Sequence, residues 1–275
     1  MYPIVYKRPL NPSVTLMEVE APYIARKARA GQFIILRVNE TGERIPLTIA
    51  DHDAEKGSIT LLYQKVGKTT LLLDTLDVGD AILDVVGPLG RATELEGYRK
   101  VAVIGGGVGC AIAYPEAKTA HEAGARVDMI AGFRSRDIVM LEEEFRAVSH
   151  RLFVMTDDGS YGEKGFVTVK LQELLDAGEA YDLVIAIGPL PMMRAVAGVT
   201  KPFGIKTLVS MNPIMIDGTG MCGGCRLTVG GETKFACVDG PEFDAHQIDW
   251  DEAMQRLTQY REEEHACRLK FMGGE

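Results

Sequence analysis

The sequence is poor in tryptophan and has no long hydrophobic run. It holds one Trp in 275 residues, and aromatic residues make up 7% of the chain. No apolar stretch approaches the roughly 20 residues that a membrane-spanning helix needs, so no membrane association is expected. Residues 1–8 lack the apolar core of a signal peptide. These absences predict a cytoplasmic protein.

A surplus of basic residues is also missing. The chain has 30 Lys and Arg against 39 Asp and Glu, a formal charge of −9. Nucleic-acid-binding proteins normally present a basic face, so the sequence predicts no nucleic-acid partner. The composition is ordinary for a globular protein, and the length allows two compact domains plus a small third one.

Cysteine is scarce but clustered. Of the five cysteines, Cys222, Cys225 and Cys237 lie within sixteen residues of one another, whereas Cys110 and Cys267 stand apart. An odd number of cysteines without a signal peptide indicates a reducing compartment. In that setting, clustered thiols bind a metal more often than they form disulfides.

Residues 1–97 are predicted to form a small antiparallel barrel. Short apolar and β-branched segments alternate there with glycine-containing turns. The expected strands are residues 14–20, 32–38, 44–50, 58–66 and 81–86, with one helix at 69–76.

Residues 98–210 are predicted to form an α/β domain. Continuous apolar strands that alternate with helices indicate a parallel sheet covered on both faces. The expected strands are 101–104, 127–131, 152–156, 183–187 and 207–209, and the expected helices are 111–123, 139–148, 169–175 and 192–199. Residues 211–275 then form a third region, with strands at 226–229 and 233–236 and a polar helix at 251–264.

A glycine-rich turn joins the first parallel strand to its helix. Its residues are Gly105, Gly106, Gly107, Val108 and Gly109. Glycines at this place let the backbone approach a pyrophosphate, which helix N-terminal N–H groups favour. The third glycine of a G-x-G-x-x-G motif is replaced by Cys110, so this is not an ordinary Rossmann fingerprint. A tight turn without a ligand is the alternative.

Two further loops follow later strands of the same predicted sheet. Their candidate nucleotide-binding residues are Asp157, Asp158 and Gly159 in one loop, and Gly188, Pro189 and Met192 in the other. Ligands of open α/β sheets bind beyond the carboxyl ends of the strands, so we expect the three loops to line one crevice. Each loop taken alone could be a plain turn.

The cysteine cluster has the spacing of an iron–sulfur site. Asp217 is followed after four residues by Cys222, after two more by Cys225, and after eleven more by Cys237. The plant-type 2Fe–2S pattern is C-x4-C-x2-C with a distant fourth cysteine. Asp217 therefore occupies the place of the first ligand, and a carboxylate there should change the cluster's reduction potential.

Other readings of these cysteines stay open. A zinc site of three cysteines with Asp217, Cys267 or His246 is chemically acceptable, and so is a loop without metal. Cys267 is the rival of Asp217 as the fourth cluster ligand. Cys110 is read as a small residue that allows close helix packing.

A candidate flavin motif lies in the predicted barrel. Arg44 and the start of the 69–76 helix could neutralise a pyrophosphate, and Pro46, Leu47 and Thr48 would lie along a flat ring. The helix start contributes Gly67, Lys68, Thr69 and Thr70. This segment is not a P-loop, because the upstream glycine of that motif is replaced by Leu62. An edge strand and a helix cap are the plain alternative.

With these motifs in order, the chain resembles the ferredoxin-NADP reductase superfamily over residues 1–210. Over its whole length it resembles the dihydroorotate dehydrogenase electron-transfer subunits. It is similar above all to the small subunits of electron-bifurcating NADH-dependent reduced ferredoxin:NADP oxidoreductases, and Asp217 is the feature that favours these. The resemblance implies an FAD barrel at 1–97, a nucleotide domain at 98–210 and a 2Fe–2S domain at 211–275. Leu47 departs from the pattern, because many members have an aromatic residue against the flavin there.

The resemblance also implies an activity. Hydride would pass between NAD(H) and FAD, single electrons would pass to the 2Fe–2S cluster, and Thr48 would hydrogen-bond the flavin ring. A larger partner subunit with FAD and 4Fe–4S clusters is implied, with ferredoxin reached through it. NADP(H) stays open because Arg134 and Arg136 could hold a 2′-phosphate. The rivals are a dihydroorotate dehydrogenase electron-transfer subunit and a zinc-stabilised regulatory subunit that binds nucleotide.

Overall fold

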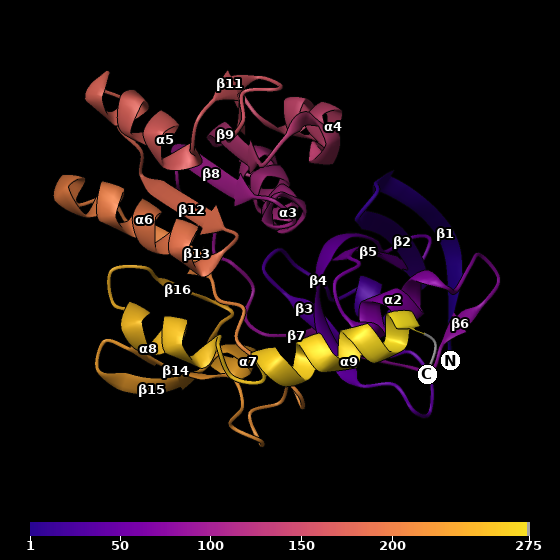
Figure 1. The fold of residues 1–275 in the computed structure, drawn as a ribbon. Coiled ribbons are helices and arrows are strands. Elements are labelled where there is room, and N and C mark those ends of the chain that lie inside the picture. The colour runs from indigo at the N-terminus through magenta and orange to yellow at the C-terminus, as the bar shows by residue number, and fades with distance from the viewer. Residues whose placement is uncertain (274–275) are drawn as a thin grey trace.

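The first part of the chain forms a nearly closed antiparallel barrel in the computed structural model, which describes residues 1–273 (Figure 1). Its strand order is β6-β1-β2-β5-β4-β3-β7. The elements are β1 (Tyr2–Asn11), β2 (Val14–Glu20), α1 (Pro22–Ala25), β3 (Phe33–Arg37), β4 (Arg44–Asp53), β5 (Ser58–Gln64), α2 (Lys68–Asp74), β6 (Ala81–Ile82) and β7 (Asp84–Leu89).

The barrel closes around side chains that alternate along each strand. Ile34 on β3 pairs with Leu47 on β4, and Leu36 pairs with Ile45. All four pack in the barrel core, because successive side chains of a strand point to opposite faces. The residues between them face outward, toward the rest of the chain.

A second sheet of seven strands follows, with the order β11-β10-β9-β8-β12-β13-β16. All its pairings are parallel except that of β13 with β16, and helices cover it. Its elements are β8 (Lys100–Gly106), α3 (Gly109–Glu122), β9 (Arg126–Phe133), η1 (Arg136–Ile138), α4 (Glu142–Val148), β10 (Arg151–Thr156), β11 (Glu163–Lys164), α5 (Val167–Asp176), β12 (Leu183–Ile187), α6 (Leu190–Thr200), η2 (Lys201–Phe203), β13 (Thr207–Ser210) and β16 (Glu242–Asp244).

The remaining elements belong to the segment that carries the cysteines. They are β14 (Arg226–Val229), β15 (Glu232–Phe235), α7 (Ala236–Asp239), α8 (Trp250–Arg256) and α9 (Arg261–Gly273). β14 and β15 form a two-stranded sheet of their own. The segment returns to the second sheet through β16, and α9 reaches across to α2 of the barrel (Figure 1). Within residues 1–273, no helix has the length and hydropathy needed to cross a membrane.

Most predicted elements are present, and three predictions need correction. Strand β1 was not predicted, because it has a proline at each end and exposes Val5 and Tyr6. The single strand expected at 81–86 is two strands, since β6 pairs with β1 and β7 with β3. The helix expected at 251–264 is also two, because residues 257–260 form turns and Tyr260 takes a φ of 64°.

Candidate functional site

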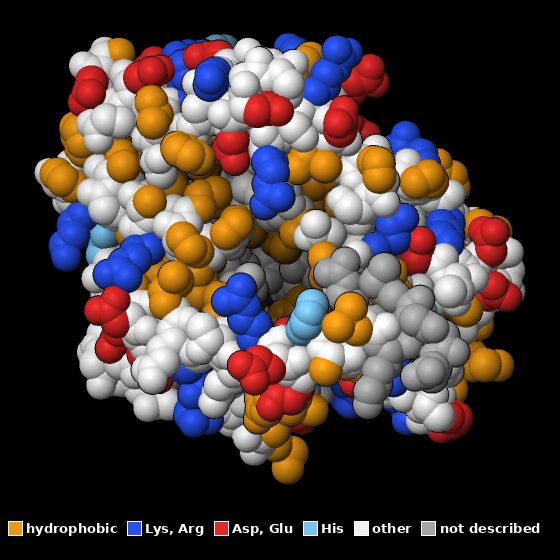
Figure 2. All heavy atoms as spheres, in the orientation of Figure 1, with side chains coloured by type: hydrophobic (Ala, Val, Ile, Leu, Met, Phe, Trp, Pro, Cys, Tyr) orange, Lys and Arg blue, Asp and Glu red, His pale blue; other side chains and the backbone are white. Residues whose placement is uncertain are grey.

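The strand order of the second sheet reverses between β8 and β12. β9 and β10 continue from β8 on one side, and β13 lies beyond β12 on the other. In open parallel sheets the crevice at such a reversal, beyond the carboxyl ends of the strands, is where nucleotides bind. The glycine turn after β8 and the loop after β12 lie on either side of this crevice. Figure 2 shows a hollow on this face between the barrel and the second sheet.

These two predicted nucleotide loops are in direct contact. A Cβ atom on Gly109 would lie 2.3 Å from the carbonyl oxygen of Ile187, and one on Gly106 would lie 2.4 Å from Sδ of Met192. Only glycine therefore allows the turn to meet the end of β12. Gly107 differs, because its φ is +58° and a Cβ there would meet no atom within 4 Å. The open face of the turn at Gly107 can therefore admit a ligand.

The third predicted loop lies farther along the sheet edge. Asp157, Asp158 and Gly159 are exposed after β10, and β9 separates that strand from β8. The carboxylate of Asp158 accepts hydrogen bonds from the N–H (2.9 Å) and hydroxyl (2.6 Å) of Ser160, which lower its pKa. Adjacent strands are about 4.8 Å apart, so this loop stands roughly 10 Å from the glycine turn along the same edge.

The flavin motif lies on β4, and the strand's alternation separates its side chains. Pro46 pairs with Ile35 of β3 and Thr48 pairs with Phe33, so Pro46 and Thr48 face outward together with Arg44. Leu47, which the sequence placed along the flavin ring, instead turns into the barrel core. It can line the outer face only through its backbone.

Side chains of α2 already bind some of the backbone N–H groups at the start of this helix. The N–H groups of Val66 and Gly67 both donate to the Thr70 hydroxyl at 3.1 Å. Thr69 is buried, and its hydroxyl donates to Glu43 at 3.3 Å. Lys68 is exposed, and a Cβ on Gly67 would meet no atom within 4 Å. The open parts of this helix start are therefore the space beside Gly67, whose own N–H is engaged, and the side chain of Lys68.

The four candidate cluster ligands are arranged as two pairs. Cys225 and Cys237 are both buried, and the N–H of Cys237 donates to Sγ of Cys225 at 3.4 Å. Cys222 is exposed, and Asp217 lies close enough for its backbone N–H and its charge to act on the Cys222 thiol. Within the described residues, no three His, Cys, Asp or Glu side chains surround a single ion position. A 2Fe–2S cluster does not require this, because its four ligands are divided between two irons.

The protonation of these groups differs with their surroundings. Burial, followed by the neighbouring Cys225 sulfur, raises the pKa of the Cys237 thiol to about 12. A hydrogen bond from the N–H of Gly224 lowers the pKa of Cys222. The Thr219 hydroxyl and N–H lower the pKa of Asp217, whose carboxylate they bind at 2.6 and 3.0 Å. The Cys237 thiol therefore gains most from a cation that takes the place of its proton.

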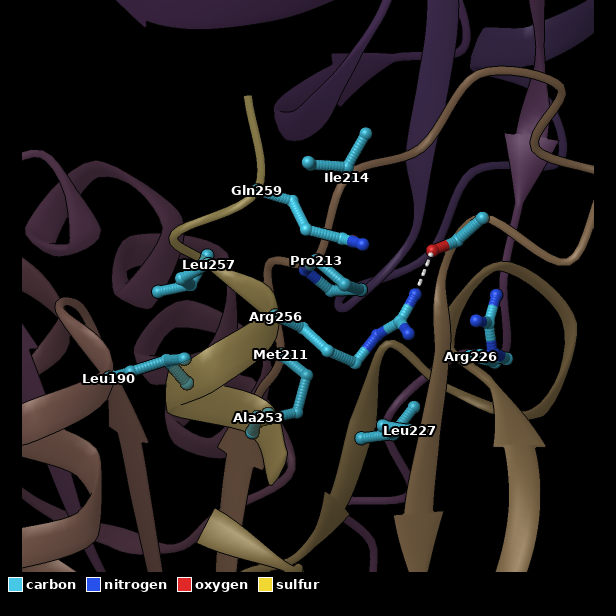
Figure 3. Close-up of a pocket in the computed structure, with 11 residues that line it drawn as sticks. Leu190, Met211, Pro213, Ile214, Arg226, Leu227, Ala253, Arg256, Leu257 and Gln259 are labelled. Atoms are coloured by element: carbon cyan, nitrogen blue, oxygen red, sulfur yellow. Dashed lines mark hydrogen bonds between the residues drawn. The ribbon is translucent and has the colours of Figure 1, made fainter. Parts of the chain in front are cut away.

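Three arginines hold the backbone of the cluster loop, residues 211–225. The sequence predicted Arg44 for a flavin pyrophosphate and did not predict Arg226 or Arg256. Arg44 on β4 donates to the carbonyls of Ile216 (3.1 Å) and Asp217 (3.3 Å). Arg226 donates to the Gly223 carbonyl at 3.2 Å, and Arg256 of α8 donates to that of Gly224 at 3.0 Å (Figure 3). The position of Arg226 directly after Cys225 is a signal that could have identified it, whereas Arg256 is remote from the cysteines in sequence.

Arg256 reaches the loop beside a small apolar cavity of about 20 Å³. Leu190, Met211 and Leu227 line it, and Figure 3 shows the Arg256 guanidinium pointing from α8 toward the loop carbonyl. Nε of Arg256 is buried and has no partner among the described residues. Among the described residues, the Arg256 guanidinium therefore makes one hydrogen bond, and its acceptor Gly224 directly precedes Cys225.

The cluster loop packs directly on the outer face of the barrel. A Cβ on Gly218 would lie 2.6 Å from Cγ1 of Ile35 and 3.0 Å from Cδ1 of Leu89. Ile35 is the β3 partner of Pro46 in the flavin motif. The fold therefore places the predicted flavin strand and the predicted cluster loop side by side.

The remaining thiols and the predicted histidine lie elsewhere. Nε2 of His246 is 3.1 Å from the Ile205 carbonyl, in the second sheet region. Cys267 is half-buried on α9. Cys110 is fully buried, and a Cβ on Gly105 would lie 2.7 Å from its Cα, so its small size permits the approach of strand and helix. Burial raises the pKa of the Cys110 thiol to about 12, which fits a packing role.

Known proteins resemble this chain along its full length. Residues 212–249 match the family of iron–sulfur cluster binding domains of dihydroorotate dehydrogenase B. A dihydroorotate dehydrogenase B (NAD(+)) electron transfer subunit homolog of Thermotoga maritima is 47% identical, covering 92% of this chain and 89% of its own. The corresponding electron transfer subunit of Shouchella clausii is 33% identical, covering 84% and 90%.

A solved structure shares the whole architecture. It is an NADH-dependent reduced ferredoxin-NADP oxidoreductase, studied for flavin-based electron bifurcation, with 44% identity and a TM-score of 0.94. The match covers 99% of this chain and 98% of that chain. The predicted reductase-like fold with a C-terminal cluster domain is thereby confirmed.

Proposed function

Because this chain belongs to the family of dihydroorotate dehydrogenase B electron-transfer subunits and their homologues, we propose a specific role for it within that family. It exchanges hydride between NAD(H) and FAD and single electrons with a 2Fe–2S cluster. It does so as the small subunit of a bifurcating NADH-dependent ferredoxin:NADP oxidoreductase. A bound flavin supplies the chemistry that joins these events, since it accepts two electrons together and releases them singly.

The barrel residues hold and orient the flavin in this proposal. Pro46 and Thr48 present the outer face of β4 to the ring, and Thr48 offers a hydroxyl for a hydrogen bond. Gly67 and Lys68 at the start of α2 receive the pyrophosphate, where helix N-terminal N–H groups favour negative charge. Because Arg44 already binds the cluster loop, its role is to link the flavin strand to the cluster.

The nucleotide binds at the strand-order reversal between β8 and β12. The open side of Gly107 accepts the pyrophosphate, and the contact between Gly106 and Met192 sets the width of the crevice. Hydride transfer needs the nicotinamide held over the flavin in a near-attack position, which this crevice can provide because it faces the barrel.

Asp217, Cys222, Cys225 and Cys237 hold the cluster in this proposal. The observation that carries the function is the contact of the cluster loop with the flavin strand, through Arg44 and through Gly218 on Ile35. A cofactor on β4 and a cluster in this loop would be neighbours. Electron transfer between them would need no movement of the barrel relative to the cluster loop.

The larger partner subunit, with its own FAD and 4Fe–4S clusters, docks at the exposed end of the cluster loop. Met221 and Ile216 are 88% and 56% exposed there, and both precede the exposed Cys222 in the loop. Exposed apolar side chains beside a redox centre favour docking of another protein. Electrons would leave for the partner, and finally for ferredoxin, by this face.

Purification without oxygen and titration with NADH test the proposal. The protein should carry FAD and about two irons per chain, and NADH should bleach the flavin and then produce a reduced-cluster signal in electron paramagnetic resonance. Rates with NADH and NADPH should favour NADH. Colourless protein with zinc in place of iron would contradict the proposal in favour of a regulatory nucleotide-binding subunit.

The dihydroorotate dehydrogenase assignment is the second candidate, and the match of residues 212–249 to that enzyme's cluster domain favours it. The two candidates differ in their partner. Co-purification with a large iron–sulfur flavoprotein supports the bifurcating role. Co-purification with a flavin-containing dihydroorotate-oxidising enzyme supports the other.

A further inference from the structure

Two glutamates and a threonine meet in the interior where the three parts of the chain join. Glu116 lies on α3 and is fully buried, and Glu242 lies on β16. Thr93 belongs to the connection between β7 and β8, and its hydroxyl oxygen is 3.0 Å from Oε1 of Glu116 and 2.6 Å from Oε2 of Glu242. The sequence did not predict this group, although Glu116 is an acidic residue in the otherwise apolar first part of α3, residues 109–117.

The surroundings provide nothing else to satisfy the two carboxyl groups. Oε2 of Glu116 and Oε1 of Glu242 are shielded from solvent and have no hydrogen-bond partner among the described residues. Glu242 as a whole residue is half-buried, but Oε1 of its carboxyl group is shielded from solvent. A buried, unpaired carboxylate is costly, so at least one of the two must carry a proton.

Counting hydrogens assigns that proton. The Thr93 hydroxyl has one hydrogen and can donate it to only one carboxylate. The shorter contact, to Glu242, marks the acceptor of this bond. Glu116 is then the protonated partner, which donates its own hydrogen to the Thr93 oxygen or to Glu242. Burial, together with the Glu242 charge, raises the pKa of Glu116 well above its usual value, and burial raises that of Glu242 to about 7.

The charged groups on the elements packed around the pair are engaged elsewhere. Arg29, two residues before Gly31 of the barrel, is exposed. Glu94 and Glu96, in the connection between β7 and β8, are exposed as well. The other charged groups have their own partners: Lys118 of α3 with Asp51 (2.8 Å), Arg91 of the connection with Asp239 (3.6 Å), and Asp244 of β16 with the Gln247 amide (2.9 Å).

The pair lies where all three parts of the chain are tied together. A Cβ on Gly31 of the barrel would lie 2.3 Å from the Thr93 hydroxyl oxygen. The N–H of Thr93 donates to Ala30 at 3.0 Å, and the N–H of Arg91 donates to Gly240 at 2.7 Å. Glu242 follows the candidate ligand Cys237 by five residues. Displacing β16 from α3 would therefore displace the segment that carries the cysteines.

We infer that Thr93, Glu116 and Glu242 form a one-proton lock that positions the cluster-bearing segment against the nucleotide sheet and the barrel. Glu116 and Glu242 are positioning residues and do not touch a cofactor. With one proton present, the three groups satisfy one another. When the Glu116 O–H bond breaks and the proton leaves for water, two carboxylates face each other and repel. The consequence for electron transfer rests on the proposed function.

A polar cavity lies between the segments that precede Gly31 and Glu116 in the chain. The cavity has a volume of about 250 Å³ and lies between the barrel and α3, with Asp51, His52 and Lys118 in its lining. Ala30 and Pro115 also line it, and they directly precede Gly31 and Glu116 in the chain.

Thermal unfolding of the purified full chain between pH 5 and 9 tests the lock. The folded protein holds a proton that the unfolded chain releases near pH 4.5, so the lock stabilises the protein at low pH and this stabilisation is lost as pH rises through the folded pKa. Relative to Glu116→Gln, the melting temperature of the wild type should fall by roughly 3–5 °C per pH unit. Glu122→Gln, an exposed change on the same helix, should follow the wild type. Parallel curves for wild type and Glu116→Gln would overturn the inference.

Infrared spectroscopy detects the proton directly. The wild type at pH 6 should show the carbonyl band of a protonated, buried carboxylic acid, and Glu116→Gln should lose it while Glu122→Gln keeps it. A band that is absent from the wild type, or retained in both variants, would show that there is no such proton. Should Glu116→Gln not fold, Thr93→Val serves instead, because removing the shared hydroxyl should steepen the fall of the melting temperature with pH.

The pH profile of cluster reduction by NADH tests the positioning role. The wild-type rate should fall at alkaline pH, whereas that of Glu116→Gln should stay level. A parallel fall in both would remove the link to electron transfer. If the wild type contains no flavin and no cluster, the proposed function fails, while the unfolding and infrared results still decide the lock.

Discussion

The glycine turn of the second sheet and the cluster loop are held in opposite ways. The turn is shaped by backbone atoms from strands next to it, as where Gly109 meets the carbonyl of Ile187. The cluster loop is held by guanidinium groups, one of which, Arg44, lies 172 residues away from its acceptor at Ile216. The predicted phosphate turn is thus shaped by close contacts between backbone atoms, whereas the cluster loop depends on charged side chains that the fold brings to it.

This difference also concerns charge. The turn offers N–H dipoles to an anion and needs no charged side chain nearby. The cluster loop, in contrast, has three arginines on its carbonyls, and the positive charge of Arg256 lies beside the cysteines. Net charge and hydrogen bonding tune the potential of an iron–sulfur centre. The arginines should therefore influence the reduction potential of a cluster bound here as well as the conformation of the loop.

The largest effect is expected from removing a buried cysteine. Cys225→Ser should reduce the iron content from about two per chain to nearly none, because the buried pair would lose one of its thiolates. Iron analysis and the visible spectrum measure this. Cys267→Ser is the matched control, and iron loss in that variant as well would identify Cys267 as a ligand.

A methyl group on the glycine turn should be the next most damaging change. Gly109→Ala would force a Cβ against the Ile187 carbonyl, at a cost of about 1–3 kcal/mol, and should raise the KM for NADH on the order of tenfold or more. Steady-state kinetics and thermal unfolding measure both effects. Gly198→Ala on α6 is the control, because its added methyl meets no atom within 4 Å. Equal kinetics for the two variants would argue against a nucleotide at this turn.

Replacing the carboxylate by a thiolate should shift the cluster's potential and leave its iron in place. Thiolate donates more electron density to iron than a carboxylate does, and clusters with non-thiolate ligands have higher potentials than all-cysteine ones, so Asp217→Cys should lower the reduction potential. A redox titration followed by electron paramagnetic resonance measures the shift. An unchanged potential would mean that Asp217 is not a ligand, and its hydrogen bonds to Thr219 would then be its only role.

The smallest effect is expected from the arginine anchors. Arg256→Met removes a charged hydrogen bond to Gly224 and should lower stability by about 1–2 kcal/mol and the cluster potential slightly. Arg226→Met should do less, because Arg226 is exposed and its charge is screened by solvent. Thermal unfolding and redox titration compare the two. A larger effect from Arg226 would reverse the ranking of the anchors.

Much of the fold could be predicted because its signals are local. The apolar strands from β8 to β13 and the helices between them follow from periodicity, and β2, β12 and β14 have the predicted bounds. Strand β1 could not be recognised, since it is exposed and contains prolines. The break between α8 and α9 depends on the left-handed backbone of Tyr260, a residue type that gives no such signal.

The candidate ligand residues of the site could be proposed from the sequence, but the contacts between them and the rest of the fold could not. Cysteine spacing and glycine density identified the cluster loop and the nucleotide turn. The sequence could not predict that the Leu47 side chain points into the barrel. Its direction depends on which face of β4 is buried, and the pairing of β4 with β3 decides this. The ligand assignment itself stays a prediction until iron is measured.

The sequence by itself determined the types of the elements, the glycine turn and the set of thiol and carboxylate donors, because periodicity and residue chemistry act over a few neighbouring residues. Only the tertiary structure decided that Arg44 binds the cluster loop and that Glu116 meets Glu242. These groups are far apart along the chain. Their contacts exist only after both sheets have formed and packed, since no local pattern specifies which remote side chain will fill a buried space.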